Sequence, residues 1–219
     1  MIFSKSRINQ ILFFAIIIAA IFAGWTVSEL FTSKNHNNDI IVNFNLTDHF
    51  DSKVSEKTYE GFNKVFFFGF THCPDICPIS ANLMANVINE LNSEQISTKS
   101  IKFFFVTVDP KRDTPQRLKE FLKSFNSEII GLTGTQNELI PIWKDFFVHV
   151  ESSLHSEYQN NLNQSNNDSQ LNIEEVNYMV QHTAFYYLFD NQNNLINILP
   201  FGSTIEHVKG ELKKLLKII

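Results

Sequence analysis

Residues 64–80 read KVFFFGFTHCPDICPIS, and this stretch decides the fold class. Its first part, residues 64–70, is short and almost wholly apolar, which is typical of a strand buried on both faces of a sheet. Beyond it, apolar residues recur at spacings of three and four, which predicts one face of a helix. These residues are Ile76, Ile79, Leu83, Val87 and Leu91. The stretch therefore predicts a buried strand that passes directly into a helix.

The same alternation continues along the chain. Residues 101–108, IKFFFVTV, predict a second buried strand. Thr114 followed by Pro115 predicts a helix start, with Thr114 as N-cap and Pro115 at the first helical position. The apolar stripe of that helix is Leu118, Phe121, Leu122 and Phe125. A short strand at 129–132 and a helix at 136–147 are expected next. Strands joined through helices imply right-handed parallel crossovers.

The C-terminal part predicts a different kind of pairing. Residues 183–189 and 195–199 are expected strands, and the segment DNQNN (190–194) between them favours a β-hairpin. The last helix carries its apolar residues at Ile205, Val208, Leu212, Leu215 and Ile219. Parallel crossovers followed by an antiparallel hairpin predict an α/β fold, with a mixed sheet and helices on both faces.

Composition narrows the classes of function. The chain has 219 residues, a formal net charge of −5 and two cysteines. This length fits one globular domain with an additional segment. An aromatic content of 13 % with 7 glycines and 6 prolines excludes a collagen-like or disordered chain. The negative charge argues against a nucleic-acid binder. Two cysteines exclude a disulfide-rich scaffold and a four-cysteine zinc site, but allow one disulfide, one dithiol or two ligands of a mixed metal site.

The first thirty residues have the features of a membrane segment. Residues 11–27, ILFFAIIIAAIFAGWTV, contain no charge and no proline, and with their flanks they approach the length that spans a bilayer. Lys5 and Arg7 precede the run and Glu29 follows it, which keeps the N-terminus cytoplasmic. The alternative is a cleaved signal peptide, but the run is longer than usual and no clear small-x-small cleavage site follows it. We expect an uncleaved, single-pass anchor in the inner (cytoplasmic) membrane, with the C-terminal domain facing the periplasm.

Three parts of the chain are therefore expected. Residues 1–30 are the cytoplasmic N-terminus and the anchor, residues 31–45 a polar tether, and residues 46–219 the globular domain. Within that domain, residues 159–172 read QNNLNQSNNDSQLN. Such a stretch has too little apolar surface to offset the entropy lost on ordering. We expect a polar surface insertion over residues 155–176.

The chemistry-bearing residues follow the first strand. Cys73 and Cys77 are four residues apart where the strand passes into the helix. A helix that begins near Pro74 places both thiols at its positive end, where free N–H groups and the macrodipole favour the thiolate. The carboxyl ends of strands in an open α/β sheet are also where ligands usually bind. The alternative is two buried cysteines that lie close by accident. The prolines beside both cysteines, and Asp75 between them, argue against it.

Soft thiolates select Cu(I), zinc or iron–sulfur clusters. With two cysteines, an iron–sulfur cluster or an all-cysteine zinc site needs other ligands or a second chain, whereas Cu(I) is satisfied by two thiolates and an imidazole. The seven candidate histidines are His36, His49, His72, His149, His155, His182 and His207. We expect His36 and His207 to be solvated and His72 to point away from the thiols, while His149 and His155 flank the insertion. His182 stands at the mouth of a strand, and its position alone leaves a structural or surface role open.

Three blocks of sequence then resemble the Sco/SenC family of membrane-anchored copper chaperones. They are GFTHCPDICP (69–78), VTVDPKRDTPQRLKEF (106–121) and YMVQHTAFYYLFD (178–190), and with the anchor they cover most of the exported chain. The resemblance implies a thioredoxin-like fold. It also implies one copper ion, Cu(I) or Cu(II), bound by the cysteines of a C-x-x-x-C motif and a distant histidine, here Cys73, Cys77 and His182. Family members help assemble cytochrome c oxidase, by delivering copper to the binuclear copper site of subunit II or by reducing the cysteines of that site. The resemblance implies that the partners of this chain are cytochrome c oxidase subunit II and other copper chaperones.

Two features depart from the family pattern. The family commonly has an acidic residue just before the ligand histidine, where this chain has Gln181, and this bears on what orients the imidazole. The Asn-rich insertion is also longer than usual. In the second block, Asp109, Arg112, Asp113 and Thr114 have two interpretations. In the first, they support the metal loop or contact a partner beneath it. In the second, they form a strand-to-helix turn in which Asp113 or Thr114 caps the next helix. The second interpretation is favoured.

Copper binding and transfer is the leading function, so we expect a binding protein rather than an enzyme in the strict sense. The alternative is a thiol–disulfide oxidoreductase, in which Cys73 and Cys77 cycle between dithiol and disulfide on exported proteins without a metal role. Thioredoxins separate their thiols by two residues, whereas three residues give room to surround a metal, although a disulfide stays possible. A peroxidase is disfavoured, because the threonine that usually precedes the reactive cysteine is not evident.

Overall fold

The computed structural model describes residues 15–20, 22, 42–152 and 178–218. The chain divides into two units, Met1–Asp39 and Ile40–Ile219. In the first unit, residues 15–20 and 22 are helical. Of the helices in the described ranges, none is long and apolar enough to cross a membrane. Most of the expected anchor (11–27) and all of the expected insertion (155–176) lie outside the described residues.

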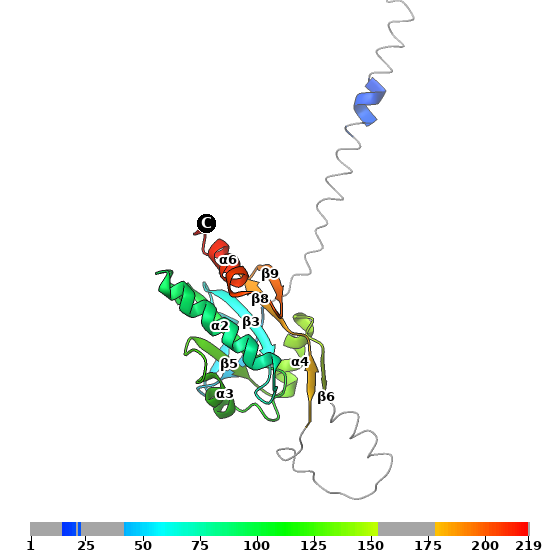
Figure 1. Ribbon diagram of the computed structural model, residues 1–219. Coiled ribbons are helices and arrows are strands. Elements are labelled where there is room, and N and C mark those ends of the chain that lie inside the picture. Colours follow the sequence, from blue (N-terminus) through cyan, green and yellow to red (C-terminus); the bar gives the residue numbers. More distant parts are fainter. Residues whose placement is uncertain (1–14, 21, 23–41, 153–177, 219) are drawn as a thin grey trace, which may run out of the picture. The chain divides into compact units, whose positions relative to one another are not determined.

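A seven-stranded mixed sheet forms the centre of the second unit, with the strand order β2-β1-β5-β4-β3-β8-β9 (Figure 1). The strands β3 (Asn63–Gly69), β4 (Ile101–Thr107) and β5 (Ile129–Thr133) are parallel neighbours. The strand β8 (Phe185–Phe189) runs antiparallel both to β3 and to β9 (Leu195–Pro200). The predicted parallel strands and the late hairpin are therefore confirmed.

Three helices of this unit begin where the sequence supplies a side-chain cap. In α3 (Pro115–Leu122), the Thr114 side chain accepts a hydrogen bond from the backbone N–H of Arg117, and Pro115 occupies the first turn, as predicted. Thr204 caps α6 (Ile205–Leu215) in the same way. In α4 (Gln136–Asp145), Thr135 and Glu138 form a capping box. These side chains satisfy N–H groups that the first turn of a helix leaves without partners.

Side chains of β3 alternate between the two faces of the sheet and show which helices cover each face. Phe67 packs against Tyr186, whose hydroxyl donates to the Ser80 carbonyl oxygen of α2 (Ile76–Ser93). Phe66 and Phe68 pack on the opposite face, against Phe146 at the end of α4. Helices therefore cover both faces, as the sequence predicts.

Ion pairs tie α6 to α2 on the first of these faces. Lys209 lies 2.9 Å from Glu94 and also pairs with Glu90, while Lys213 pairs with Glu94. Figure 1 shows the two helices side by side, with α6 in red and α2 in green. This contact holds the C-terminal end of α2, the end opposite the cysteines, against α6.

The chain before β3 contributes two strands that the sequence analysis did not predict. β1 (Asn45–Asp48) and β2 (Lys53–Ser55) form a hairpin that extends the sheet through antiparallel pairing of β1 with β5. Val42 and Phe44 fall within the stretch expected to be tether, and each is only 4 % exposed. The packed domain therefore includes residues from Val42 onward.

The segment around His182 also differs from expectation. The strand expected over 183–189 is observed as β8, two residues shorter at its start, and a short strand that the sequence analysis did not predict precedes it. β7 (Val180–His182) pairs antiparallel with β6 (Val150–Ser152) in a sheet of its own, and β8 begins at Phe185. We call the β6–β7 pair the His182 ribbon. Next to the end of β7, the Thr183 N–H donates to the His149 carbonyl oxygen and the Thr183 hydroxyl accepts from the His149 N–H.

Candidate metal centre

The cysteines lie in the connection between β3 and α2. Cys73 is half-buried in the turn that follows β3, and Cys77 is fully buried in the first turn of α2. The helix begins at Ile76 with Asp75 as N-cap residue, two residues later than expected. Gly69 makes room for this arrangement, because a Cβ there would lie 2.9 Å from the Sγ of Cys77. Only a glycine lets the end of β3 approach the buried thiol this closely.

The two thiols have opposite acid strengths. The N–H of Cys77 donates to the Sγ of Cys73 over 3.4 Å, and the N–H of Phe70 donates to the Sγ of Cys77 over 3.5 Å. A hydrogen bond from the Cys77 side chain, together with backbone N–H groups, lowers the pKa of Cys73 to about 5. The same bond to Cys73 and burial raise the pKa of Cys77 above its usual range. The helix N-terminus thus favours one thiolate, at Cys73, and not the two that the sequence analysis expected.

His182 lies next to the buried thiol. Its Nε2 atom is 3.6 Å from the Sγ of Cys77, and its Nδ1 atom is 3.0 Å from the carbonyl oxygen of Thr183. A carbonyl oxygen only accepts, so the proton belongs on Nδ1 and the lone pair of Nε2 faces the sulfur. Burial lowers the pKa of His182, which keeps the imidazole neutral. A neutral imidazole with its second nitrogen held is the form in which histidine binds a metal.

The structure therefore brings together Cys73, Cys77 and His182, which the sequence analysis selected. The contacts run in a chain, from Cys73 to Cys77 and from Cys77 to His182. Within the described residues, no group of three His, Cys, Asp or Glu side chains already forms a closed metal-ligand set.

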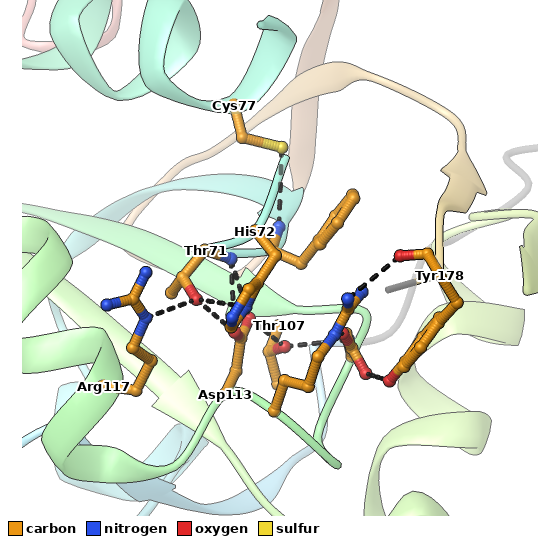
Figure 2. Close-up of polar contacts among 10 residues, drawn as sticks. Thr71, His72, Cys77, Thr107, Asp113, Arg117 and Tyr178 are labelled. Carbon is orange, nitrogen blue, oxygen red and sulfur yellow. Dashed lines mark hydrogen bonds and ion pairs between the residues drawn. The ribbon is translucent and has the colours of Figure 1, made fainter. Parts of the chain in front are cut away.

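The other described histidines lie away from the thiols. His72 contacts the Thr71 hydroxyl oxygen at 3.2 Å, and Figure 2 shows it directed away from the thiol of Cys77, as expected. His149 is exposed on the ribbon beside Glu151. His49 is buried, and its Nδ1 accepts from the N–H of Gly131, which is a structural role. His36 and His155 lie outside the described residues.

A buried carboxylate supports the turn after β3 from beneath (Figure 2). Asp113 accepts hydrogen bonds from the N–H and hydroxyl of Thr71 and from the hydroxyl of Thr107. It thereby links the turn after β3 to the end of β4. Burial raises the pKa of Asp113 to about 6, against the lowering effect of these bonds. Of the two capping candidates, Thr114 caps α3, whereas Asp113 is used for this cross-link.

Several residues of this region were not singled out from the sequence, among them Thr71, Thr107 and Tyr178. The Tyr178 hydroxyl donates to Asp109, and Arg112 donates to the Tyr178 carbonyl oxygen over 2.9 Å. Asp109 and Arg112 therefore do more than shape a turn, because they contact the segment that leads to His182. A single tyrosine before a strand gives no periodic or spacing signal, so nothing in the sequence could have paired it with a turn 66 residues away.

Solved structures with the same fold include several with copper bound. The crystal structure of ScoI from Arabidopsis thaliana with copper bound matches with a TM-score of 0.65 and 26 % identity, over 81 % of this chain and 98 % of that one. The structure of yeast Sco1 with copper bound matches with a TM-score of 0.66 and 27 % identity, over 81 % and 88 %. These matches confirm the expected thioredoxin-like α/β fold.

Curated relatives give the same result at the level of sequence. Protein sco1 of Schizosaccharomyces pombe is 33 % identical over 163 residues, covering 74 % of this chain and 56 % of that protein. A SCO2-like protein of Rickettsia prowazekii is 35 % identical over 150 residues, covering 67 % and 62 %. The chain thus spans less than two thirds of the length of either relative. The SCO1/SenC family model matches residues 32–217, and the chain therefore belongs to the SCO1/SenC family.

Proposed function

We propose that the chain is a copper chaperone that binds one copper ion through Cys73, Cys77 and His182. One observation carries the proposal: the free Nε2 of His182 faces the buried Sγ of Cys77 at 3.6 Å, at the end of the strand that leads to Cys73. Two thiolates and a neutral imidazole are soft and intermediate donors, which suit Cu(I) better than hard cations. The relatives solved with copper bound support the same cargo.

The three donors have different roles in loading. Cys73 is the half-exposed thiolate at neutral pH, so it is the donor that first meets an incoming ion. Cys77 is buried and protonated, and it gives up its proton when it binds. His182 enters with its tautomer already fixed by Thr183. Loading at pH 7 therefore releases about one proton, from Cys77.

The client that we propose is cytochrome c oxidase. In this proposal the chain delivers copper to the binuclear site of subunit II, or reduces the thiols of that site. Residues 11–27 serve as a single-pass anchor that places the domain in the periplasm, next to such a client. The family resemblance of the three sequence blocks supports both statements.

A second candidate function is thiol–disulfide exchange without a metal. One observation favours it, the asymmetry of the two thiols. A half-exposed Cys73 with a pKa of about 5 suits an attacking thiolate, and a protonated Cys77 next to it suits the thiol that resolves a mixed disulfide. The two functions use the same pair, so copper affinity and redox activity need separate measurements.

Titration of the reduced chain, purified in detergent, with Cu(I) in competition with a chromophoric chelator tests the proposal. We expect one ion per chain, loss of tight binding in Cys73→Ala and Cys77→Ala, and a large drop in affinity in His182→Ala. His149→Ala is the matched control, because His149 is exposed on the same ribbon and does not contact the thiols. Equal losses in His182→Ala and His149→Ala would contradict the assignment of His182.

A further inference from the structure

The position of His182 depends on what holds its ribbon. In the described residues, β6 and β7 pair with each other and not with the seven-stranded sheet. Their hydrogen bonds, including both bonds between His149 and Thr183, are internal to the ribbon and its end. Internal bonds keep the ribbon in shape. The C-terminal end of β7 is held because it runs through Thr183 and Ala184 into β8, and Val180 packs in the core, but within the described ranges the N-terminal end of β7 has no strand partner in the seven-stranded sheet. The position of that end depends on other contacts between the ribbon and the rest of the domain.

Tyr178, two residues before β7, provides such contacts. Its side chain is buried, and its hydroxyl donates to one carboxylate oxygen of Asp109. Arg112 donates through Nη1 to the carbonyl oxygen of Tyr178 over 2.9 Å. The guanidinium of Arg112 also stacks over the Tyr178 ring, with Cζ 3.5 Å from the ring centroid. Arg112 and Asp109 are themselves an ion pair through Nε. Both the backbone and the side chain of Tyr178 therefore contact Asp109 and Arg112 in the turn after β4.

Arg112 also reaches the residue that backs the metal centre. Its Cζ lies 5.7 Å from the centroid of the Phe70 ring. Phe70 in turn contacts both candidate ligands on this side, because its N–H donates to the Sγ of Cys77 and its ring meets the His182 ring edge-on at 5.9 Å. Arg112 thus lies between the base of the His182 ribbon and the strand end that holds Cys77.

Burying Arg112 at this position lowers the stability of the fold. Its side chain is only 6 % exposed, and its Nη2 atom is buried without a hydrogen-bond partner among the described residues. A buried donor without a partner reduces stability, and a well-packed apolar side chain often replaces a buried ion pair without loss. Packing alone does not account for an arginine here. The planar guanidinium makes three contacts at once that an apolar side chain cannot make together. It pairs with Asp109, donates to the carbonyl oxygen of Tyr178 and stacks on the Tyr178 ring.

We propose that Arg112 is a positioning residue that, through Tyr178, holds His182 against the thiols, so that it decides whether copper is bound by three ligands or by the two cysteines alone. This inference rests on the proposed copper function. With the contacts intact, the imidazole stays next to Cys77. Without them, the ribbon keeps its own hydrogen bonds but moves away from the strand end, while Cys73 and Cys77 keep their geometry.

The test compares Arg112→Met in two backgrounds, the wild-type chain and His182→Ala, with full-length chains in detergent. In the wild-type background we expect Cu(I) affinity to fall about 10–100-fold, as is typical when a residue that orients a ligand is lost. X-ray absorption should show that the nitrogen neighbour is lost and both sulfur neighbours remain. In the His182→Ala background, Arg112→Met should have no further effect. The control is Lys111→Met, which removes the same charge at an exposed neighbouring position.

Two results would overturn the inference. One is an Arg112→Met chain with wild-type affinity and an intact nitrogen neighbour. The other is an equal loss of affinity in both backgrounds, which would mean that Arg112 supports the domain in general. If Arg112→Met does not fold, Tyr178→Phe asks the same question by removing one hydroxyl, with a smaller loss expected in the same pattern.

A metal-free measurement separates this inference from the proposed function. Hydrogen exchange of the apo chain should be faster in β7 of the Arg112→Met variant and unchanged in β3. A wild-type chain that binds no copper would refute the proposed function, and the exchange of β7 would still show whether Arg112 holds the ribbon. Equal β7 exchange in the variant and the wild type would refute the inference alone.

Discussion

The reactivity of Cys73 should be almost independent of pH between 6 and 8. With a pKa of about 5, Cys73 is about 90 % thiolate at pH 6, whereas a free cysteine of pKa near 8.5 is about 0.3 % thiolate. A thiolate of low pKa is also less nucleophilic, by about 40-fold for a difference of about 3.5 pKa units. Cys73 should then react roughly 8-fold faster than free cysteine at pH 6, and roughly 10-fold slower at pH 8.

Alkylation with iodoacetamide, followed by peptide mass spectrometry at each pH, measures this profile. The rate at Cys73 should fall by half only near pH 5, while Cys77 stays unmodified because it is buried. Cys77→Ala provides the matching perturbation, since the Cys77 side chain is the largest cause of the lowered pKa. In that variant the profile should shift to higher pH. A wild-type rate that rises steeply between pH 6 and 8, or one unchanged in Cys77→Ala, would refute this account of the thiols.

Three further predictions concern stability and topology. Gly69→Ala puts a Cβ 2.8 Å from the Phe105 ring and 2.9 Å from the thiol of Cys77, so it should lower the free energy of unfolding by about 1–3 kcal/mol. Gly210→Ala, whose Cβ meets nothing within 4 Å, should be neutral or stabilising in urea titrations, and equal losses would contradict the packing argument. The pKa of Asp113 is raised to about 6, so the stability that its protonated form contributes is lost as pH rises from about 4 to 6, by about 3 kcal/mol. Asp113→Asn should remove this pH dependence, and a constant difference from wild type between pH 4 and 7 would contradict it. A reporter enzyme that works only outside the cytoplasm, fused after Ile219, should be active, and the chain should stay with membranes after a high-salt wash. Recovery as a shorter, soluble species would instead indicate cleavage near Gly24.

The sequence predicts the elements whose signal is local. The apolar runs of β3 and β4, the DNQNN turn between β8 and β9, and the Thr114–Pro115 helix start all appear as predicted. The strands β1, β2, β6 and β7 have only three or four residues each, too few for a period-two pattern to stand out. These short strands are held by their partners, β5 for β1 and β6 for β7, and such pairing leaves no mark in the segment itself.

The same limit applies at the candidate site. The spacing of Cys73 and Cys77 is local, and the family resemblance adds His182. The link from Asp113 to Thr71 joins residues 42 positions apart, and the contacts of Tyr178 with Asp109 and Arg112 join residues 69 and 66 positions apart. The opposite pKa shifts of the two thiols depend on the hydrogen bond between their side chains and on the deeper burial of Cys77. The links of Asp113 and Tyr178 and the burial of Cys77 depend on contacts between residues that are far apart in the sequence, so they cannot be predicted from the local sequence pattern.

X-ray absorption on the Cu(I)-loaded chain tests the central claim most directly. Two sulfur neighbours and one nitrogen neighbour are predicted for the wild type, from Cys73, Cys77 and His182. In the His182→Ala variant, both sulfur neighbours should remain and the nitrogen neighbour should be absent. A wild-type spectrum with only nitrogen and oxygen neighbours, or a nitrogen neighbour that persists in His182→Ala, would contradict the three-ligand site.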